Sequence, residues 1–264
     1  MNSQTTSIEQ VKAVLFDVDG TIMPQGWPAS DEVISVFRKE LQWKILIWPS
    51  TGKWADYMRW VAVWMWLEPF NYIGAENGGL FMERTAIKPV TYKSINTARD
   101  VSDISEFLAT IKLDSFKRKF KLHNKWVKYR PELKETMITL FPSGTNIDET
   151  LVWEQYFKSL IEDNGWELYV VRHPDGCIDI VPNGVSKANS VQEIMLRYNL
   201  RAEEILVAWD GKNDIWLFVP GVKSIVVANA HPDIKALGEK HGGYQANGND
   251  GSGFIEWLKH YDVI

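Results

Sequence analysis

Short apolar runs alternate along this chain with longer segments of helical periodicity. The apolar runs predict buried parallel strands at residues 11–16, 43–48, 205–209 and 223–228. Apolar residues at helical spacing predict helices at residues 30–42, 53–67, 185–198, 232–239 and 253–260. This alternation of strand and helix indicates an α/β protein built on a doubly wound parallel sheet.

The pattern changes in the middle of the chain. Strands are predicted at residues 119–130, 135–141, 166–171 and 177–181, with helices at residues 101–113 and 148–164. Strands that pair across turns, together with two helices, favour an α+β unit on an antiparallel sheet. We therefore predict a core domain of residues 1–83 and 184–264, interrupted by an inserted domain of residues 84–183.

Two carboxylates directly follow the first predicted strand. Asp17 and Asp19 lie one residue apart after the run at residues 11–16, and Gly20 comes next. In open α/β sheets the chemistry lies beyond the carboxyl ends of the strands, so both acids are expected at an active-site position. A solvated Asp-Gly turn is the alternative interpretation of this stretch alone.

Polar residues also follow the second predicted strand. Ser50, Thr51, Gly52 and Lys53 lead into the helix at residues 53–67. A hydroxyl at a strand end, beside the free amides of a helix N-terminus, is well placed to bind an anion. Capping of the helix by Ser50 or Thr51 is the alternative. The helix is apolar around most of its circumference, which favours burial, and self-association into a homodimer is a further hypothesis.

Two more carboxylates, Asp210 and Asp214, follow the strand at residues 205–209. With Asp17 and Asp19 they place four acids on one edge, where they would repel one another unless a hard cation is bound. Oxygen ligands of this kind suit Mg²⁺, which binds few carboxylates and keeps waters for a phosphate oxygen. The sequence therefore predicts a Mg²⁺ cofactor, with these four aspartates as candidate ligands.

The same residues predict phosphoryl transfer. Asp17 would be the nucleophile and form an aspartyl-phosphate. Asp19 would protonate the leaving oxygen and then deprotonate the attacking water. Lys187, near the start of the helix at residues 185–198, and Thr51 would supply positive charge and hydrogen bonds to the phosphoryl group.

Four segments together resemble the motifs of the haloacid dehalogenase (HAD) superfamily, in the family's order. They are Asp17-Val18-Asp19-Gly20-Thr21, Ser50-Thr51-Gly52-Lys53, Lys187 and Asp210-Gly211-Lys212-Asn213-Asp214. The inserted domain lies between the second and third motifs. It therefore resembles the large cap of the sugar-phosphatase branch, which includes sucrose-phosphate phosphatase, Cof-type phosphatases and phosphomannomutase. Asn229-Ala230-His231-Pro232 resembles a segment common in that branch.

The resemblance implies a Rossmann-like doubly wound core with an inserted α+β cap, and Mg²⁺-dependent hydrolysis of a sugar phosphate. It implies that Asp17, the backbone carbonyl of Asp19, and Asp210 or Asp214 hold the metal. It also implies that the cap closes over the substrate and recognises its sugar. Two alternatives stay open: a phosphotransferase similar to phosphomannomutase, and a catalytically silent protein that keeps the fold for binding.

Substrate-binding candidates come from the motifs and from a basic run at residues 117–130. They are Gly20, Gly52, Lys53, Asn213, Lys128 and Arg130, to which Glu76 and Asn77 near the domain junction are added. For the basic run, a solvated sheet face is an equal alternative.

Three residues depart from the family's pattern. Lys53 stands where this branch usually has Arg, which keeps the charge but loses the forked hydrogen bonding of a guanidinium. Trp209 stands where Gly normally precedes Asp210, and its indole would either crowd the phosphate pocket or point into the sheet core. Trp216 replaces a residue that is usually small in the sucrose-phosphatase group.

Composition narrows the function classes. The chain has 264 residues, a formal net charge of −5 and one cysteine, Cys177. We therefore expect no general attraction to nucleic acid, and a reducing compartment, the cytoplasm. Residues 1–7 are polar and lack a signal-peptide core, and the apolar stretch at residues 60–67 is too short to span a bilayer. The expected partner is a small phosphorylated substrate.

Overall fold

Two units make up the computed structural model, which describes residues 11–25, 28–41, 44–64, 70, 72–84, 89–112, 119–122, 125–142, 147–173 and 175–264. The core unit is Met1–Val90 with Lys187–Ile264, and the inserted unit is Thr91–Ser186. In the described part of the chain, no helix is long and apolar enough to cross a membrane.

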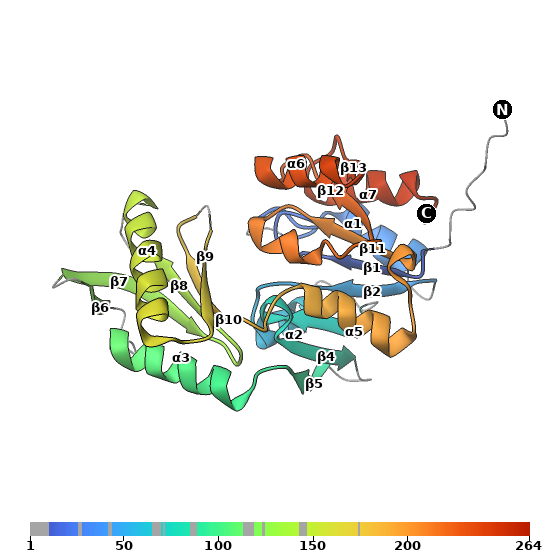
Figure 1. Ribbon diagram of the computed structural model, residues 1–264. Coiled ribbons are helices and arrows are strands. Elements are labelled where there is room, and N and C mark those ends of the chain that lie inside the picture. The colour runs from blue at the N-terminus through green and yellow to red at the C-terminus, as the bar shows by residue number, and fades with distance from the viewer. Residues whose placement is uncertain are drawn as a thin grey trace. The chain divides into compact units, whose positions relative to one another are not determined.

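A parallel sheet of five strands forms the centre of the core unit, in the order β13-β12-β11-β1-β2 (Figure 1). The strands are β1 (Ala13–Phe16), β2 (Leu46–Pro49), β11 (Ile205–Trp209), β12 (Lys223–Val226) and β13 (Tyr244–Gln245). β1 lies between β11 and β2, so the sheet grows outward from β1 in two directions. This confirms the predicted doubly wound core and brings the carboxyl ends of β1, β2 and β11 to one edge.

Helices flank this sheet and hold the end of β1 in place. They are α1 (Asp31–Val36), continued by the π-helical turn η1 (Phe37–Leu41), α2 (Ala55–Trp64), α5 (Ala188–Tyr198), α6 (Pro232–Lys240) and α7 (Asp250–His260). Phe16, the last residue of β1, packs against Phe37 and Phe254, with ring centroids 5.3 and 5.5 Å away. All three rings are buried. This packing fixes the strand end from which Asp17 follows.

A short hairpin lies beside β2. β3 (Tyr72–Ala75) and β4 (Leu80–Arg84) pair antiparallel around the 3₁₀ turn η2 (Glu76–Gly78), and β5 (Pro89–Ser94) is the third strand of this sheet. An isolated bridge between Ser50 and Gly74 joins the hairpin to the end of β2. The hairpin thus supports the segment that carries the second motif.

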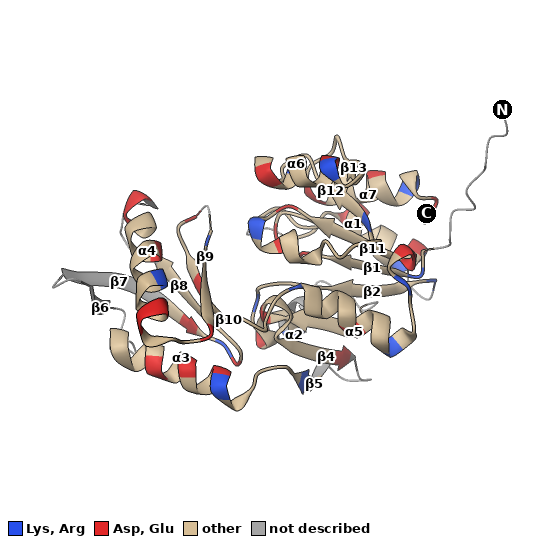
Figure 2. Cartoon of the chain, in the orientation of Figure 1, with Lys and Arg blue, Asp and Glu red and all other residues tan. Residues whose placement is uncertain are grey.

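The inserted unit is an antiparallel sheet with two helices on one face (Figure 1). Its strands, in the order β6-β7-β8-β10-β9, are β6 (Lys119–Leu122), β7 (Lys125–Leu133), β8 (Ile138–Pro142), β9 (Leu168–Arg172) and β10 (Ile178–Pro182). The helices α3 (Ala98–Ile111) and α4 (Ile147–Asn164) contribute Phe107 and Phe157 to its core, and charged residues recur along both helices (Figure 2). This is the α+β architecture that the sequence predicts.

One strand prediction in the inserted unit is wrong. The sequence predicts a single strand over residues 119–130, whereas β6 and β7 are two antiparallel strands. Leu122, at the end of β6, pairs with Lys125, at the start of β7. Alternating polarity continues through both strands, and it therefore hides the reversal.

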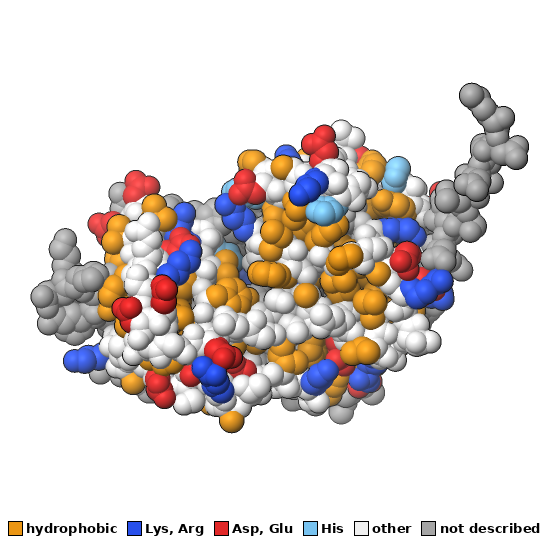
Figure 3. Space-filling view, viewed as in Figure 1, with side chains coloured by type: hydrophobic (Ala, Val, Ile, Leu, Met, Phe, Trp, Pro, Cys, Tyr) orange, Lys and Arg blue, Asp and Glu red, His pale blue; other side chains and the backbone are white. Residues whose placement is uncertain are grey.

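The prediction of a homodimer through the helix at residues 53–67 is only partly covered by the structure. The described helix, α2, ends at Trp64, and the side chains from residue 60 onward lie outside the described residues. Elsewhere, Leu196, Ile215 and Trp216 are exposed. Figure 3 shows hydrophobic side chains interspersed with charged ones on the face it draws. Self-association stays a prediction.

Polar residues cluster on the face of the inserted sheet opposite its helices. Asp179 alternates along β10 with residues buried under the helices. Its carboxylate accepts a hydrogen bond from Thr139 Oγ1 at 2.6 Å and lies 3.0 Å from His173 Nε2. Burial would raise the pKa of Asp179, but His173, Lys134 and Thr139 lower it to about 2. Burial would lower the pKa of His173, but Asp179 raises it, with Asp175 adding to the effect and Lys134 opposing it.

Replacing His173 with Gln is expected to remove a pH-dependent part of the stability. The His173 contribution is fully present below the ordinary pKa of 6.5 and is lost as the pH rises through the raised value. The Asp179 contribution is present above 3.8 and is lost as the pH falls toward about 2. The Tm difference between wild type and H173Q should therefore be larger near about pH 5 than at a pH well above the ordinary histidine pKa of 6.5. An equal difference at both pH values would contradict the ion pair, and H260Q, at an exposed histidine, is the control.

Candidate active site

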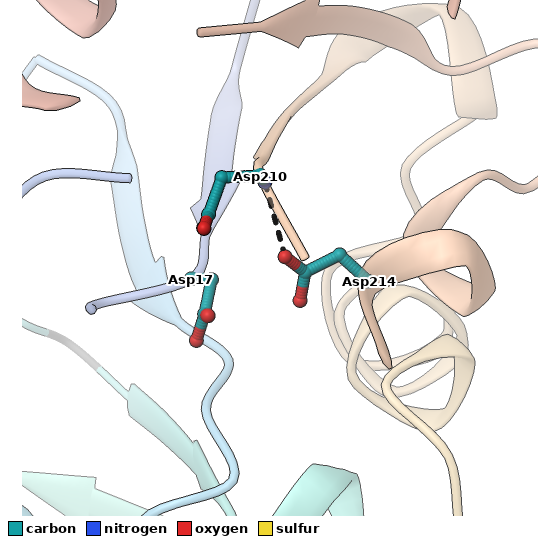
Figure 4. A group of neighbouring side chains, drawn as sticks. All are labelled: Asp17, Asp210 and Asp214. Carbon is teal, nitrogen blue, oxygen red and sulfur yellow. Dashed lines mark hydrogen bonds between the residues drawn. The ribbon is translucent and has the colours of Figure 1, made fainter. Parts of the chain in front are cut away.

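Three carboxylates meet at the carboxyl edge of the core sheet. Asp17 follows β1 and Asp210 follows the neighbouring strand β11, while Asp214 belongs to the 3₁₀ helix η4 (Lys212–Leu217). One carboxylate oxygen from each acid lies within 4.8 Å of an oxygen from each of the other two, and the side chains converge on one space (Figure 4). The parallel pairing of β1 with β11 thus brings together acids from opposite ends of the chain.

Lys187 is a buried cation between two of these acids. It lies directly before α5 and is fully buried. Its Nζ lies 2.8 Å from Asp17 Oδ1 and also pairs with Asp214 Oδ1. Burial would lower the pKa of Lys187, but Asp17 and Asp214 raise it, so the side chain stays charged at neutral pH.

Negative charge exceeds positive charge in this cluster. Burial is the main cause that raises the pKa of Asp17 to about 7 and that of Asp210 to about 8. Asp214 adds to both shifts, and Lys187 opposes them. A doubly charged cation would balance the three carboxylates against the one lysine, and carboxylate oxygens are the ligands that Mg²⁺ prefers. The donor set fits the metal that the sequence predicts.

The loop after β11 is closed by Asp214. The backbone N–H groups of Asp210 and Gly211 donate hydrogen bonds to Asp214 Oδ2 at 3.1 and 2.8 Å. These bonds explain why Asp214 lies four residues after Asp210: at this spacing the Asp214 carboxylate reaches the backbone amides of Asp210 and Gly211. Asn213 lies in the same turn, and its Oδ1 is 2.6 Å from the position that a Cβ on Gly211 would take.

The loop after β1 is shaped around Asp210. Thr21 Oγ1 donates a hydrogen bond to Asp210 Oδ1 at 2.6 Å. Gly20 has a φ of +81°, and a Cβ on it would lie 2.3 Å from Asp210 Oδ2. Both the backbone and the available space therefore require glycine here. Thr21 is absent from the predicted site residues, although its place at the end of the first motif could have indicated it.

Gly20→Ala is expected to destabilise the protein by more than its backbone strain and to displace Asp210. Gly165→Ala is the matched control, because Gly165 also has a positive φ, +65°, but has nothing within 4 Å of an added Cβ. The control should lose about 1–2 kcal/mol of unfolding free energy. G20A should lose more in urea unfolding, and it should bind Mn²⁺, a stand-in for Mg²⁺, more weakly. Equal losses in the two variants would contradict the close approach to Asp210.

The second motif lies at the end of β2, the strand next to β1. Thr51 is buried, and its Oγ1 accepts a hydrogen bond from the N–H of Lys53 at 3.2 Å. This bond forms a local turn, since α2 begins only at Ala55. A Cβ on Gly52 would lie 3.1 Å from Asn77 Oδ1. The strand order places Thr51 and Gly52 on the same edge as the acids.

Asp19 pairs with a different cation from Asp17. Lys53 Nζ lies 3.2 Å from Asp19 Oδ2 and 5.2 Å from the centre of the Tyr57 ring. Burial would lower the pKa of Lys53, but Asp19 raises it. Asp19 and Lys53 are both partly exposed, so this pair lies on the accessible side of the site.

The remaining predicted site residues are not brought into the acid cluster by the described contacts. Lys128 and Arg130 belong to β7, and their side chains lie outside the described residues. Glu76 and Asn77 are buried in η2, with left-handed φ values of +53° and +55°. The N–H of Asn77 donates to the carbonyl of Thr51 at 2.9 Å. The η2 turn therefore stabilises the backbone of the second motif through this hydrogen bond to Thr51.

Trp209 points into the sheet packing, the second of its two expected orientations. The indole is fully buried and stacks on Phe218, with ring centroids 5.7 Å apart and an angle of 11° between the planes. Side chains alternate along a strand, and Ala208 belongs to the core on the other face of β11. The large side chain is thus accommodated by packing against Phe218.

Comparisons with known proteins agree with this geometry. The family model of sucrose-6F-phosphate phosphohydrolase matches residues 146–262, which include Lys187, Asp210 and Asp214. The chain is 28% identical over 116 residues to 5-amino-6-(5-phospho-D-ribitylamino)uracil phosphatase YbjI of Escherichia coli. That alignment spans 44% of this chain and 41% of the relative, less than half of either protein.

Solved structures match over nearly the full chain. The sucrose-phosphatase of Synechocystis sp. PCC6803, in complex with sucrose and phosphate, has a TM-score of 0.66 at 16% identity, covering 96% of this chain and 99% of its own. The HAD-superfamily phosphatase BT1666 of Bacteroides thetaiotaomicron has a TM-score of 0.69 at 19% identity, covering 98% of each chain. These likenesses, each below 20% identity, show a shared fold. By its four motifs, its fold and the family model matched at residues 146–262, the chain is similar to the phosphatases of the haloacid dehalogenase superfamily.

Proposed function

We propose that this chain is a Mg²⁺-dependent phosphate monoester hydrolase that acts on a sugar phosphate through an aspartyl-phosphate. The observation that carries the proposal is the pairing of buried Lys187 with Asp17 and Asp214, beside Asp210. A buried cation fixes the nucleophilic carboxylate, favours its charged form and attracts the phosphoryl oxygens. The proposed metal ligands are Asp17, the backbone carbonyl of Asp19, Asp210 and Asp214.

In the proposed reaction, a carboxylate oxygen of Asp17 attacks phosphorus, and the bond from phosphorus to the sugar oxygen breaks. Asp19 gives its proton to the departing oxygen and then takes one from the water that hydrolyses the aspartyl-phosphate. Lys187 Nζ, at 2.8 Å from Asp17 Oδ1, orients the nucleophile. Thr51 and Gly52 would bind phosphate oxygens at the end of β2. Bound Mg²⁺ would neutralise charge between the carboxylates and the phosphate.

The proposed substrate class is a sugar phosphate. The match to the sucrose-phosphatase family and the sugar phosphatase BT4131 among the similar structures support it. We propose residues 84–183 as the cap domain that contacts the sugar, with Lys128 and Arg130 as candidate contacts. A cytoplasmic location and the absence of nucleic-acid and membrane partners stay predictions.

The test of this function is phosphate release with Mg²⁺ across a panel of sugar phosphates, including sucrose phosphate and hexose 6-phosphates. Release from one member that EDTA abolishes and Mg²⁺ restores would support the proposal and name the substrate. No release from any member would contradict the phosphatase proposal for that panel.

A phosphotransferase similar to phosphomannomutase is the second candidate, and the same panel distinguishes it. Such an enzyme must return the phosphoryl group to a sugar, so it would release little phosphate and would need a bisphosphate activator. A catalytically silent binding protein would bind a sugar phosphate without turnover. Trp209 is the residue that motivates this silent alternative, and its stacking on Phe218 supports the phosphatase proposal over it.

A further inference from the structure

The side chain of Asn229, a residue that follows β12, forms hydrogen bonds with two segments that are far apart in the sequence. Its Nδ2 donates hydrogen bonds to the carbonyl of Gly20 at 2.7 Å and to Asp250 Oδ1 at 3.0 Å. Its Oδ1 accepts a hydrogen bond from the N–H of Asp250 at 2.7 Å. One amide side chain thus connects the loop of the first motif to the first residue of α7.

The same segment also holds the loop of the fourth motif. The backbone N–H of His231 donates to the carbonyl of Asp210 at 2.9 Å. Asp233 pairs with Lys212 of that loop, with Oδ2 and Nζ 2.9 Å apart. Asn229 and His231 therefore hold the two acid loops from one short stretch of chain.

The contact with Gly20 bears directly on the orientation of Asp210. The Asp210 carboxylate packs against the Gly20–Thr21 segment. Thr21 Oγ1 donates a hydrogen bond to Asp210 Oδ1, and Asp210 Oδ2 occupies the space that a Cβ on Gly20 would need. A hydrogen bond to the Gly20 carbonyl fixes the rotation of the peptide between these two residues. Asp250 has a left-handed φ of +43°, which indicates that the other end of this link is also held against its backbone preference.

We propose that Asn229 is a positioning residue of the metal site. It holds the Gly20–Thr21 peptide in the orientation that aims the Asp210 carboxylate at the shared space with Asp17 and Asp214. The inference rests on the proposed metal site, but it requires no assumption about the substrate. Partners outside the ligand set typically change metal affinity by about 10- to 100-fold. Because Asn229 is exposed, the lower end of that range is expected.

The test measures Mn²⁺ binding by electron paramagnetic resonance without substrate, with Mg²⁺ as competitor. N229A should raise the Kd for Mn²⁺ about 10-fold. The double variant N229D/D250N is sharper, because it exchanges donor and acceptor within the pair. It keeps the net charge and the link to α7 but cannot donate to the Gly20 carbonyl. N247A is the matched control, since the side chain of Asn247 also donates a hydrogen bond to a carboxylate of α7, that of Glu256.

The outcomes separate the inference from the proposed function. Weakened Mn²⁺ binding in N229A and N229D/D250N, with N247A unchanged and all Tm values in EDTA alike, supports the positioning role. Wild-type affinity in the double variant overturns it, as does an equal loss in N247A, which would indicate a general effect of α7. A wild-type protein that binds no Mn²⁺ overturns both the inference and the proposed metal site. Binding without phosphate release overturns only the phosphatase proposal.

Discussion

Asp17→Asn is expected to lower sugar-phosphate hydrolysis by roughly 10⁴-fold or more, the size of loss seen when a catalytic nucleophile is removed. An amide oxygen is a poor nucleophile, and Asn cannot carry the negative charge that Lys187 holds 2.8 Å away. The fold should survive, because Asn has nearly the same shape. Burial also disfavours the charged form of Asp17, whose pKa is raised to about 7. The measurement pairs initial rates with Tm in EDTA.

Asp31→Asn is the control for this experiment, because Asp31 is an exposed aspartate of α1 outside the site. It should keep the wild-type rate. If D17N kept more than about a hundredth of the rate, Asp17 would not be the nucleophile, since removing a hydrogen bond alone costs about 10²–10³-fold. The aspartyl-phosphate mechanism would then be wrong even if the chain remained a phosphatase.

Asp17 and Asp210 could be placed from the sequence because each directly follows a short apolar run whose pattern predicts a buried strand. The run at residues 205–209 is too apolar for a surface element and too short for a helix, and it forms β11 with those bounds. Once β1 and β11 are parallel neighbours, Asp17 and Asp210 must share an edge. The positions of the acids therefore followed from local pattern and from one rule of sheet topology.

The direction in which a side chain points could not be predicted from the sequence. The role of Trp209 depends on which face of β11 it occupies, and strand alternation could have placed it only if the face of Ala208 had been known. Thr21 and Asn229 act through contacts across long stretches of sequence, with Asp210 and with Gly20. Such contacts depend on how the loops fold back, which no periodic pattern records. The sequence therefore identifies the reacting groups more readily than the groups that aim them.

Lys187→Met is expected to lower the unfolding free energy of the metal-free protein by about 3–5 kcal/mol, the cost of breaking a buried ion pair from one side. Lys187 and Asp214 are fully buried, so the carboxylates would lose their cation without gaining water. The raised pKa of Lys187 means that this contribution is fully present at pH 7, well below its ordinary value of 10.5. Urea unfolding in EDTA measures it. Lys44→Met removes an exposed pair with Glu40 and should cost less than about 1 kcal/mol.

The double variant D17N/K187M shows how much of this energy comes from the pairing of Lys187 with Asp17. If Lys187 acts on the Asp17 charge, its replacement should cost about 0.5–3 kcal/mol less in the D17N background, because part of the uncompensated charge is already gone. Strictly additive losses would mean that the Lys187 ammonium does not act on the Asp17 charge and that its stabilising effect comes from its pair with Asp214. The chemistry proposed for Asp17 requires the coupled result, since a carboxylate that the lysine does not hold would be protonated near neutral pH and could not attack phosphorus.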